Sequence, residues 1–283
     1  MRYHEISPEP RLAAYINCFW VLDEVTANAA PDPVFPDGSL ELLVYLRGAS
    51  ERVTLADGVS AGNPRLEIAG QMTRPYGIRW APGVCLVGVR FFPHTFAHFL
   101  PPGLPVHELN DLALEAEAVL GASFRAVAHQ LADCAHPAEA VARLQAYFLT
   151  RLRHRPPPTT APYLDFAVPY ILAGQGHADL DALLRKLGIG GRHLERLFGQ
   201  AVGVSPKHFC RIIRFQQAFR WLARADSLTA VATACGYYDQ AHFIRDFRHF
   251  TGTTPSAFRR GAGSISAAFL VESSSSYLYN FRE

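Results

Sequence analysis

The sequence of 283 residues lacks any uninterrupted apolar run long enough for a membrane-spanning helix, which takes about 18–20 residues. Its most apolar run, residues 84–92, is interrupted by Arg90. Glu5 and Glu9 stand where a secretory signal peptide has a basic start and an apolar block. The five cysteines are odd in number and scattered, and no two are spaced as Cys-x-x-Cys. We therefore expect reduced thiols in a cytoplasmic protein, without a disulfide framework, zinc knuckle or membrane contact.

Signals for catalysis and for metal binding are also scarce. No P-loop, His-Glu-x-x-His or Gly-x-Gly-x-x-Gly motif occurs, so no motif indicates phosphate binding or zinc-hydrolase chemistry. His94 and His98 are four residues apart and could share one helix face as metal ligands. The His-x-His pair of a metal-binding cupin is absent, however, and structural or solvated histidines are the favoured interpretation. We expect no catalytic residue, no metal and no cofactor.

Positive charge is concentrated in one part of the chain. Residues 1–159 contain 13 Lys and Arg against 16 Asp and Glu, whereas residues 160–262 contain 13 against 7. A basic segment joined to a mildly acidic one is typical of a polyanion-binding domain attached to a second domain.

Turn signals and periodicity divide the chain into five parts. Short β-rich runs at 40–46, 66–68 and 84–92 are separated by turn pairs such as Asp57-Gly58, which favours an antiparallel barrel or sandwich. In chain order we predict a β-rich domain (1–108), an alanine-rich helical bridge or dimerisation segment (109–155), a proline-rich linker (156–162), a helical domain (163–260) and a serine-rich, unstructured tail (261–283). The expected fold class is α+β.

The helical domain contains an internal repeat. An offset of 49 residues aligns His193 with His242, Arg196 with Arg245, Phe198 with Phe247, Gly203 with Gly252 and Pro206 with Pro255. Each copy is predicted to form a capped short helix, a glycine turn and a second helix, which is the helix-turn-helix unit. Asp179 and Ser227 are the expected caps of the short helices, and Asp239 is the expected cap of the second helix in the second copy. A longer helix beginning at Pro206 joins the copies.

The second helix of each copy has an outward stripe that could read DNA bases. The stripes consist of Arg192, Glu195, Arg196 and Gly199 in the first copy, and of Gln240, Ala241, Ile244, Arg245 and Arg248 in the second. Arginine can pair with guanine and glutamine with adenine, while small apolar side chains can contact thymine methyls. A single exposed arginine is ordinary, but two equivalent stripes in the basic part of the chain favour DNA binding.

These residues also carry a resemblance to a known family. Residues 234–255 (ACGYYDQAHFIRDFRHFTGTTP) and 187–198 (LGIGGRHLERLF) resemble the two helix-turn-helix units of the AraC/XylS transcription regulators. The sequence departs from the usual pattern at Tyr237, where phenylalanine is common, and at Gly190, where a capping serine is common. The resemblance implies that both second helices enter adjacent major-groove segments of double-stranded DNA. The positions that match the family's base-facing sites are Arg192, Glu195, Arg196, Gln240, Ala241 and Arg245.

In this family the other domain commonly senses a small molecule or dimerises, often through a cupin-like barrel. Residues 36–42 and 88–93 resemble an uncharacterised sensor domain found on some members. We expect an apolar or aromatic effector to lie among aromatic side chains inside the barrel, where the candidates are Trp20, Tyr45, Tyr76 and Trp80, with Phe19 and Phe91 also facing inward. These aromatics could instead simply form the core. Arg74, Arg79 or Arg90 could hold an anionic effector, but no spacing distinguishes one of them.

Two other hypotheses stay open from the sequence. The chain could be a cupin-type small-molecule enzyme, or a ligand-binding protein, with a regulatory helical domain. It could also be a regulator without an effector, whose first domain only dimerises. The favoured hypothesis is a sequence-specific transcription regulator, with promoter DNA, a small-molecule effector, RNA polymerase and a second copy of the chain as candidate partners.

Overall fold

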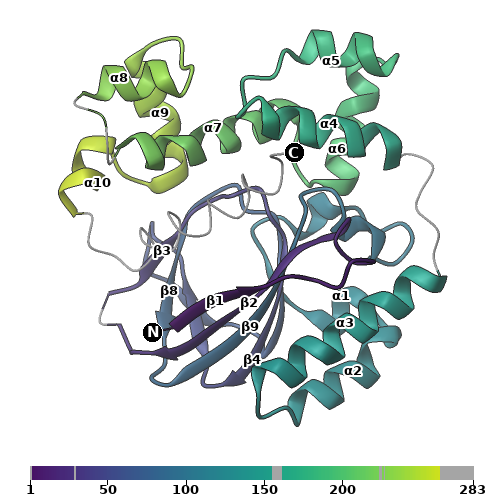
Figure 1. Cartoon of the computed structure of the whole chain (residues 1–283). Helices are drawn as coiled ribbons and strands as arrows, with labels where there is room; N and C mark the ends of the chain where they lie inside the picture. Colours follow the sequence, from purple (N-terminus) through teal and green to yellow (C-terminus); the bar gives the residue numbers. More distant parts are fainter. Residues whose placement is uncertain (1, 29, 155–160, 223–224, 226, 262–283) are drawn as a thin grey trace.

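The computed structural model describes residues 2–28, 30–154, 161–222, 225 and 227–261. An antiparallel β domain lies on one side of the molecule, and a helical domain lies on the other (Figure 1). The predicted proline-rich linker falls largely on residues 155–160, and the predicted tail largely on 262–283, both of which are outside the described residues. Among the described helices, none combines the length and hydropathy that crossing a membrane would take.

The β domain consists of two antiparallel sheets. The larger has the strand order β1-β2-β9-β4-β7-β10 and the smaller the order β3-β8-β5-β6. The strands are β1 (Arg2–Ile6), β2 (Ile16–Val25), β3 (Asp32–Val34), β4 (Glu41–Arg47), β5 (Ser50–Val53), β6 (Ser60–Gly62), β7 (Leu66–Ala69), β8 (Tyr76–Trp80), β9 (Val84–Phe91) and β10 (Ala113–Glu115). The β-rich runs expected from the sequence correspond to β4, β7 and β9, three of the four inner strands of the larger sheet.

Alternation along the central strands gives the larger sheet two different apolar faces. On β2, Phe19 and Val21 belong to the core under the helices, whereas Trp20 and Leu22 belong to a separate cluster on the opposite face. Neighbouring side chains of a strand point to opposite faces, so Phe19 and Trp20 cannot line the same cavity.

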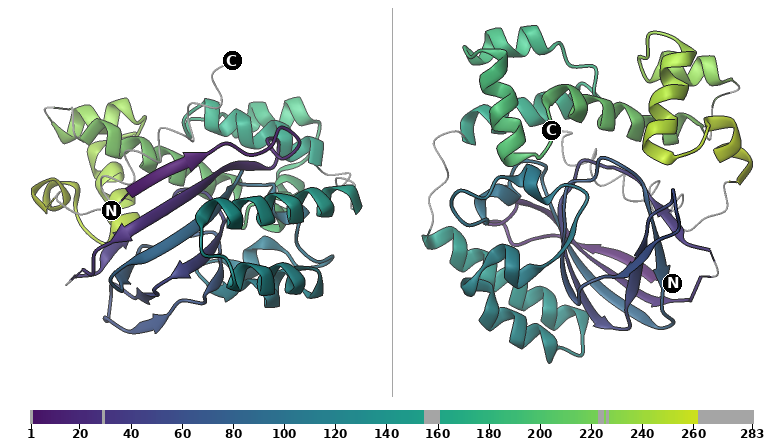
Figure 2. Two further views of the ribbon diagram at one scale, coloured as in Figure 1. Left: turned by 60° about the horizontal axis from the view of Figure 1, so that its bottom comes forward. Right: turned by 180° about the vertical axis from the view of Figure 1, so that it is seen from behind.

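Three helices cover one face of the larger sheet (Figure 2). They are α1 (Ala116–Leu120), α2 (Ala122–Ala132) and α3 (Pro137–His154). Their apolar residues, such as Phe124, Leu144 and Phe148, share one buried core with Val87 and Phe91 of β9. The helix predicted to begin near Leu109 begins later, because residues 113–115 pair with β7 as an edge strand.

The C-terminal domain is helical, as predicted. Its helices are α4 (Ala161–Ala173), α5 (Leu180–Leu187), α6 (Gly191–Ala201), α7 (Pro206–Leu222), α8 (Leu228–Ala234), α9 (Gln240–Thr251) and α10 (Pro255–Gly261). The long helix α7 runs between two groups, with α5 and α6 near one end and α8 and α9 near the other (Figures 1 and 2). The repeat seen in the sequence is thus a pair of similar units joined by one helix.

Candidate nucleic-acid interface and ligand cavity

The first helix-turn-helix unit consists of α5 and α6. The Asp179 carboxylate accepts a hydrogen bond from the Ala182 amide at 2.9 Å, which caps α5. Gly188 follows α5 in the left-handed conformation, with φ of 67°, where glycine has no steric penalty. Gly190 is the N-cap residue of α6 and provides no side-chain hydrogen bond, as expected from its departure from the family pattern.

The second unit repeats this design with α8 and α9. Ser227 accepts a hydrogen bond from the Ala230 amide at 3.1 Å, and Asp239 accepts one from the His242 amide at 2.6 Å. The two side chains therefore cap α8 and α9. Gly236 makes the turn between the two helices with φ of 58°.

Each second helix buries one stripe and exposes most of the predicted reading stripe. Two of its members are half-buried instead: Gly199, whose carbonyl lies 3.1 Å from His107 Nδ1 of the β domain, and Ile244, which packs against the core of the helical domain. Leu194, Leu197 and Phe198 are buried on α6, and Phe243 and Phe247 on α9. The six candidate base-reading residues are all exposed: Arg192, Glu195, Arg196, Gln240, Ala241 and Arg245. The arginines of this set make no salt bridge with any described residue, so their guanidinium groups are available to a ligand. Contact with bases stays a prediction for all six.

The side chain of Gln240 is oriented by a neighbouring helix. The Thr229 hydroxyl on α8 lies 2.8 Å from Gln240 Oε1. Since Oε1 can only accept, Thr229 donates, and the amide group of Gln240 keeps both hydrogens free. Nothing in the sequence pattern had indicated Thr229.

A salt bridge attaches α9 to the joining helix α7. The Arg211 guanidinium donates to both carboxylate oxygens of Asp246, with Nη2 at 2.9 Å from Oδ1. The Asp246 side chain is only 5% exposed. Arg211 also lies over the ring of Phe250, 5.4 Å from its centre. The orientation of the second reading helix α9 relative to α7 therefore depends on the Arg211–Asp246 pair.

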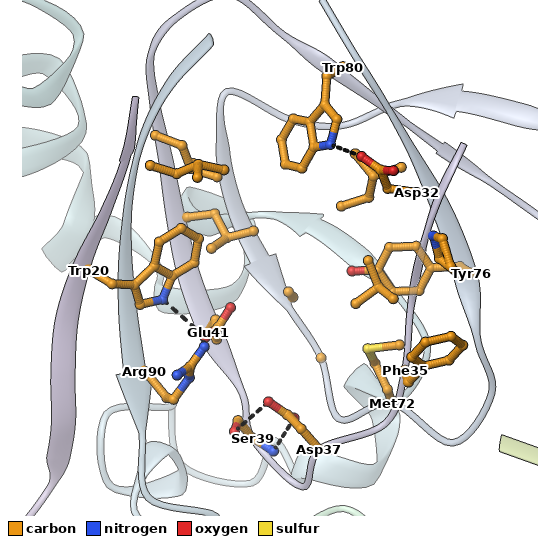
Figure 3. A pocket seen from close by; sticks show the side chains of 18 of the residues that line it. Trp20, Asp32, Phe35, Asp37, Ser39, Glu41, Met72, Tyr76, Trp80 and Arg90 are labelled. Carbon is orange, nitrogen blue, oxygen red and sulfur yellow. Dashed lines mark hydrogen bonds and ion pairs between the residues drawn. The ribbon is translucent and has the colours of Figure 1, made fainter. Parts of the chain in front are cut away.

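A cavity lies between the two sheets of the β domain (Figure 3). Its volume is about 130 Å³, close to the ~150 Å³ of an apolar cavity that admits benzene. The four aromatic residues proposed as effector contacts, Trp20, Tyr45, Tyr76 and Trp80, all line it. Their contact with an effector stays a prediction. Phe19 and Phe91 were wrongly expected here, because they lie on the opposite face of their strands.

Polar groups of the cavity wall pair with one another. The Arg90 Nε atom donates to Glu41 Oε1 at 2.8 Å, and Trp20 Nε1 donates to the same oxygen at 3.1 Å. Trp80 Nε1 donates to Asp32 at 3.1 Å. Burial raises the pKa of Glu41 above its ordinary value, while the Arg90 guanidinium acts in the opposite direction. Of the three arginines considered as anion contacts, Arg90 is the one that lines the cavity.

A second buried carboxyl group lies near the aromatic side chains of the cavity. Glu67 is 1% exposed, and its Oε2 atom has no hydrogen-bond partner. Burial raises the pKa of Glu67 to about 7, although the nearby Arg52 guanidinium lowers it in part. Glu67 is thus poised to change its charge near neutral pH.

The histidines and the serine that could suggest a metal or catalytic site lie in environments that do not form one. His94 Nε2 lies 3.0 Å from Asp165 Oδ1 of the helical domain, and His98 is buried beside Tyr15. No cluster of three or more metal-ligating side chains occurs among the described residues. Residues 58–62 read Gly-Val-Ser-Ala-Gly, the spacing of a hydrolase nucleophile turn, but Ser60 begins the exposed strand β6. It does not lie at a strand-to-helix turn, where such a nucleophile is found.

The sequence patterns did not predict several residues that join the two domains. Phe35 of the β domain is buried in the core of the helical domain, and Gln216 Nε2 donates to the Pro36 carbonyl at 2.5 Å. Asn110 Nδ2 donates to the Gly203 carbonyl at 2.7 Å. These partners are more than 90 residues apart, so no local pattern could have paired them.

Comparisons with known proteins agree with this architecture. Residues 183–261 match the Helix-turn-helix domain family, and residues 4–115 match the Domain of unknown function (DUF6597) family. The HTH-type transcriptional regulator GlxA of Rhizobium meliloti (strain 1021) is 36% identical over 87 residues, covering 30% of this chain and 27% of that protein. The HTH-type transcriptional activator RhaR of Cronobacter sakazakii (strain ATCC BAA-894) is 30% identical over 127 residues, covering 42% of this chain and 44% of that protein.

The chain therefore spans less than half the length of each of these curated relatives. Among solved structures, ToxT from Vibrio cholerae O395 aligns over 87% of this chain and 99% of its own, with 10% identity and a TM-score of 0.45. A probable AraC family transcriptional regulator from Rhodopseudomonas palustris CGA009 aligns over 34% of this chain and 96% of its own, with 28% identity and a TM-score of 0.30.

The class of protein follows from the helix-turn-helix match and from the described pair of units. The chain combines a C-terminal domain of the Helix-turn-helix domain family with an N-terminal domain of the DUF6597 family. The two curated relatives are described as a transcriptional regulator and a transcriptional activator, and not as enzymes.

Proposed function

We propose that the chain is a sequence-specific transcription regulator that reads promoter DNA with α6 and α9. The observation that carries the proposal is a pair of equivalent exposed stripes joined by the single helix α7. The stripes consist of Arg192, Glu195 and Arg196 on α6, and of Gln240, Ala241 and Arg245 on α9. Arginines and helix N-termini would bind phosphates and supply the salt-dependent part of the affinity. The stripes would supply base choice through their guanidinium, amide and small apolar groups.

The proposal includes a small-molecule effector in the cavity of the β domain. A concave space lined by aromatic rings and a few convergent polar groups is the usual form of a ligand site. The cavity lining is mainly apolar, and an apolar or aromatic effector of about benzene size fits its volume of about 130 Å³. The same proposal implies a cytoplasmic protein, with RNA polymerase and a second copy of the chain as further partners.

Base reading can be tested by selecting duplexes from a random pool with the full chain. The selected duplex and its single-base-pair variants are then compared at roughly physiological salt. We expect Arg245→Ala and Arg196→Ala each to cost about 1–3 kcal/mol and to relax selectivity at one base pair. Arg125→Ala, on the surface of α2, is the matched control and should bind as the wild type does. Equal weakening on every duplex would contradict base reading by the two arginines.

A further inference from the structure

One short segment of the β domain belongs to two sites at once. Residues 33–39, here called the strap, begin within β3 and end just before β4. Pro33, Val34, Phe35, Asp37 and Ser39 of the strap line the cavity between the sheets. Phe35 is also part of the buried core of the helical domain. The wall of the proposed effector site is therefore directly in contact with the DNA-binding domain.

The Phe35 ring packs among three phenylalanines of the helical domain. Its centre lies 5.6 Å from that of Phe219 in a stacked arrangement and 6.4 Å from that of Phe215, both on α7. It lies 5.8 Å from the ring of Phe258 on α10, which follows the second reading helix α9. Phe35 is 2% exposed. The ring thus contacts both the joining helix α7 and the helix α10 that follows the second unit.

Two further contacts hold the strap on α7. Gln216 is 8% exposed and donates its amide hydrogen to the Pro36 carbonyl. Gly38 has φ of 90°, and a Cβ atom there would lie 2.9 Å from the ring of Phe209. Glycine is required at this position both for its backbone conformation and for the close approach to α7. The sequence Phe-Pro-Asp-Gly-Ser of residues 35–39 is therefore suited to a docking turn.

Hydrogen bonds hold the strap at both of its ends. Asp37 accepts hydrogen bonds from the Ser39 amide at 2.8 Å and from the Ser39 hydroxyl at 3.0 Å. At the other end, residues 32–34 pair with β8, which carries Tyr76 and Trp80 of the cavity. A packed element of this kind shifts as a unit rather than deforming gradually.

We propose that the strap couples the cavity to the DNA-binding helices. A ligand that moves Val34 or the aromatic wall of β8 displaces Phe35 against α7 and α10, and thereby changes how α9 is held relative to α6. This inference rests on the proposed function, because it assigns the route by which the same cavity regulates DNA binding.

Coupling between two binding sites is reciprocal, so DNA can serve as the probe while the effector is unidentified. The chain has three tryptophans. Trp20 and Trp80 line the cavity, and Trp221 lies on α7. In the Trp221→Phe chain, all tryptophan emission therefore reports on the cavity.

The experiment measures acrylamide quenching of Trp20 and Trp80 in the full-length Trp221→Phe chain, with and without a saturating duplex selected from a random pool. We expect the duplex to change the quenching slope. Phe35→Ala in this background is expected to bind the duplex but to lose the change. Val59→Ala, an exposed large-to-small substitution in the same domain, is the matched control and should retain it.

Gln216→Leu provides a second variant that leaves every cavity residue in place. It should diminish the DNA-induced change in quenching even if Phe35→Ala fails to fold. Duplex binding by the Trp221→Phe chain with an unchanged slope would overturn the coupling alone, as would a change that persists in both variants. Failure to select any duplex would contradict the proposed function and the coupling with it.

Discussion

Replacing Arg211 by methionine should destabilise the second helix-turn-helix unit, because it leaves the Asp246 carboxylate buried without its cation. Asp246 is 5% exposed and Arg211 is 28% exposed, and the Arg211 guanidinium donates to both carboxylate oxygens. Removing one partner of a fully buried pair costs about 3–5 kcal/mol. Partial exposure of Arg211 and the His242 ring, with Nε2 3.8 Å from Asp246 Oδ2, reduce this cost. We expect a loss of about 2–3 kcal/mol in the free energy of unfolding.

Urea denaturation followed by circular dichroism measures this loss. The double variant Arg211→Met with Asp246→Asn should recover at least half of it, because no uncompensated charge stays buried. Arg125→Met is the matched control, since Arg125 and Glu117 form an exposed pair at 3.3 Å that is worth at most about 1 kcal/mol. If Arg211→Met is as mild as Arg125→Met, or if the double variant is no more stable than the single one, the pair does not hold α9 on α7.

Two further predictions concern the reading helix and the buried acid. Thr229→Val should weaken the base preference by about 1 kcal/mol, at the same base pair as Gln240→Ala, whereas Thr229→Ser should keep that preference. Binding to single-base-pair duplex variants measures it, and an unchanged base preference in Thr229→Val would contradict the role of the hydroxyl. For Glu67, burial raises the pKa from 4.5 to about 7, so the folded state holds its proton more tightly than the unfolded state. The protonated Glu67 side chain therefore stabilises the folded state by about 3 kcal/mol. This stabilisation is fully present below pH 4.5 and is lost as pH rises through about 7. Unfolding free energies measured from pH 4 to 8 should therefore fall more steeply in the wild type than in Glu67→Gln, and parallel curves would contradict the raised pKa of this carboxyl.

Local signals were sufficient to predict the helix-turn-helix units. Asp179, Ser227 and Asp239 are short acceptor side chains placed at the start of an apolar 3.6-residue period, and each caps its helix in the structure. Gly188 and Gly236 occupy the turns with positive φ. Caps, turns and stripes depend on residues within a few positions of one another, so a single sequence carries them.

Features that depend on distant partners could not be predicted in this way. Residues 113–115 form a strand only because the edge of β7 is available to pair with them. Phe35 is one apolar residue in a turn-rich segment, and its partners lie some 180 residues away on α7 and beyond. Of the six aromatic residues expected inside the barrel, Trp20, Tyr45, Tyr76 and Trp80 line the cavity. Phe19 and Phe91 do not, because strand alternation places Phe19 on the face opposite Trp20.

Hydroxyl-radical footprinting of the full chain on a selected duplex tests the central claim most directly. Two reading helices fixed to α7 should protect two segments about one helical turn, or roughly 10 base pairs, apart on the same face of the DNA. Arg196→Ala and Arg245→Ala should each weaken one of the two protected segments. A single protected segment, or two on opposite faces of the duplex, would contradict the account.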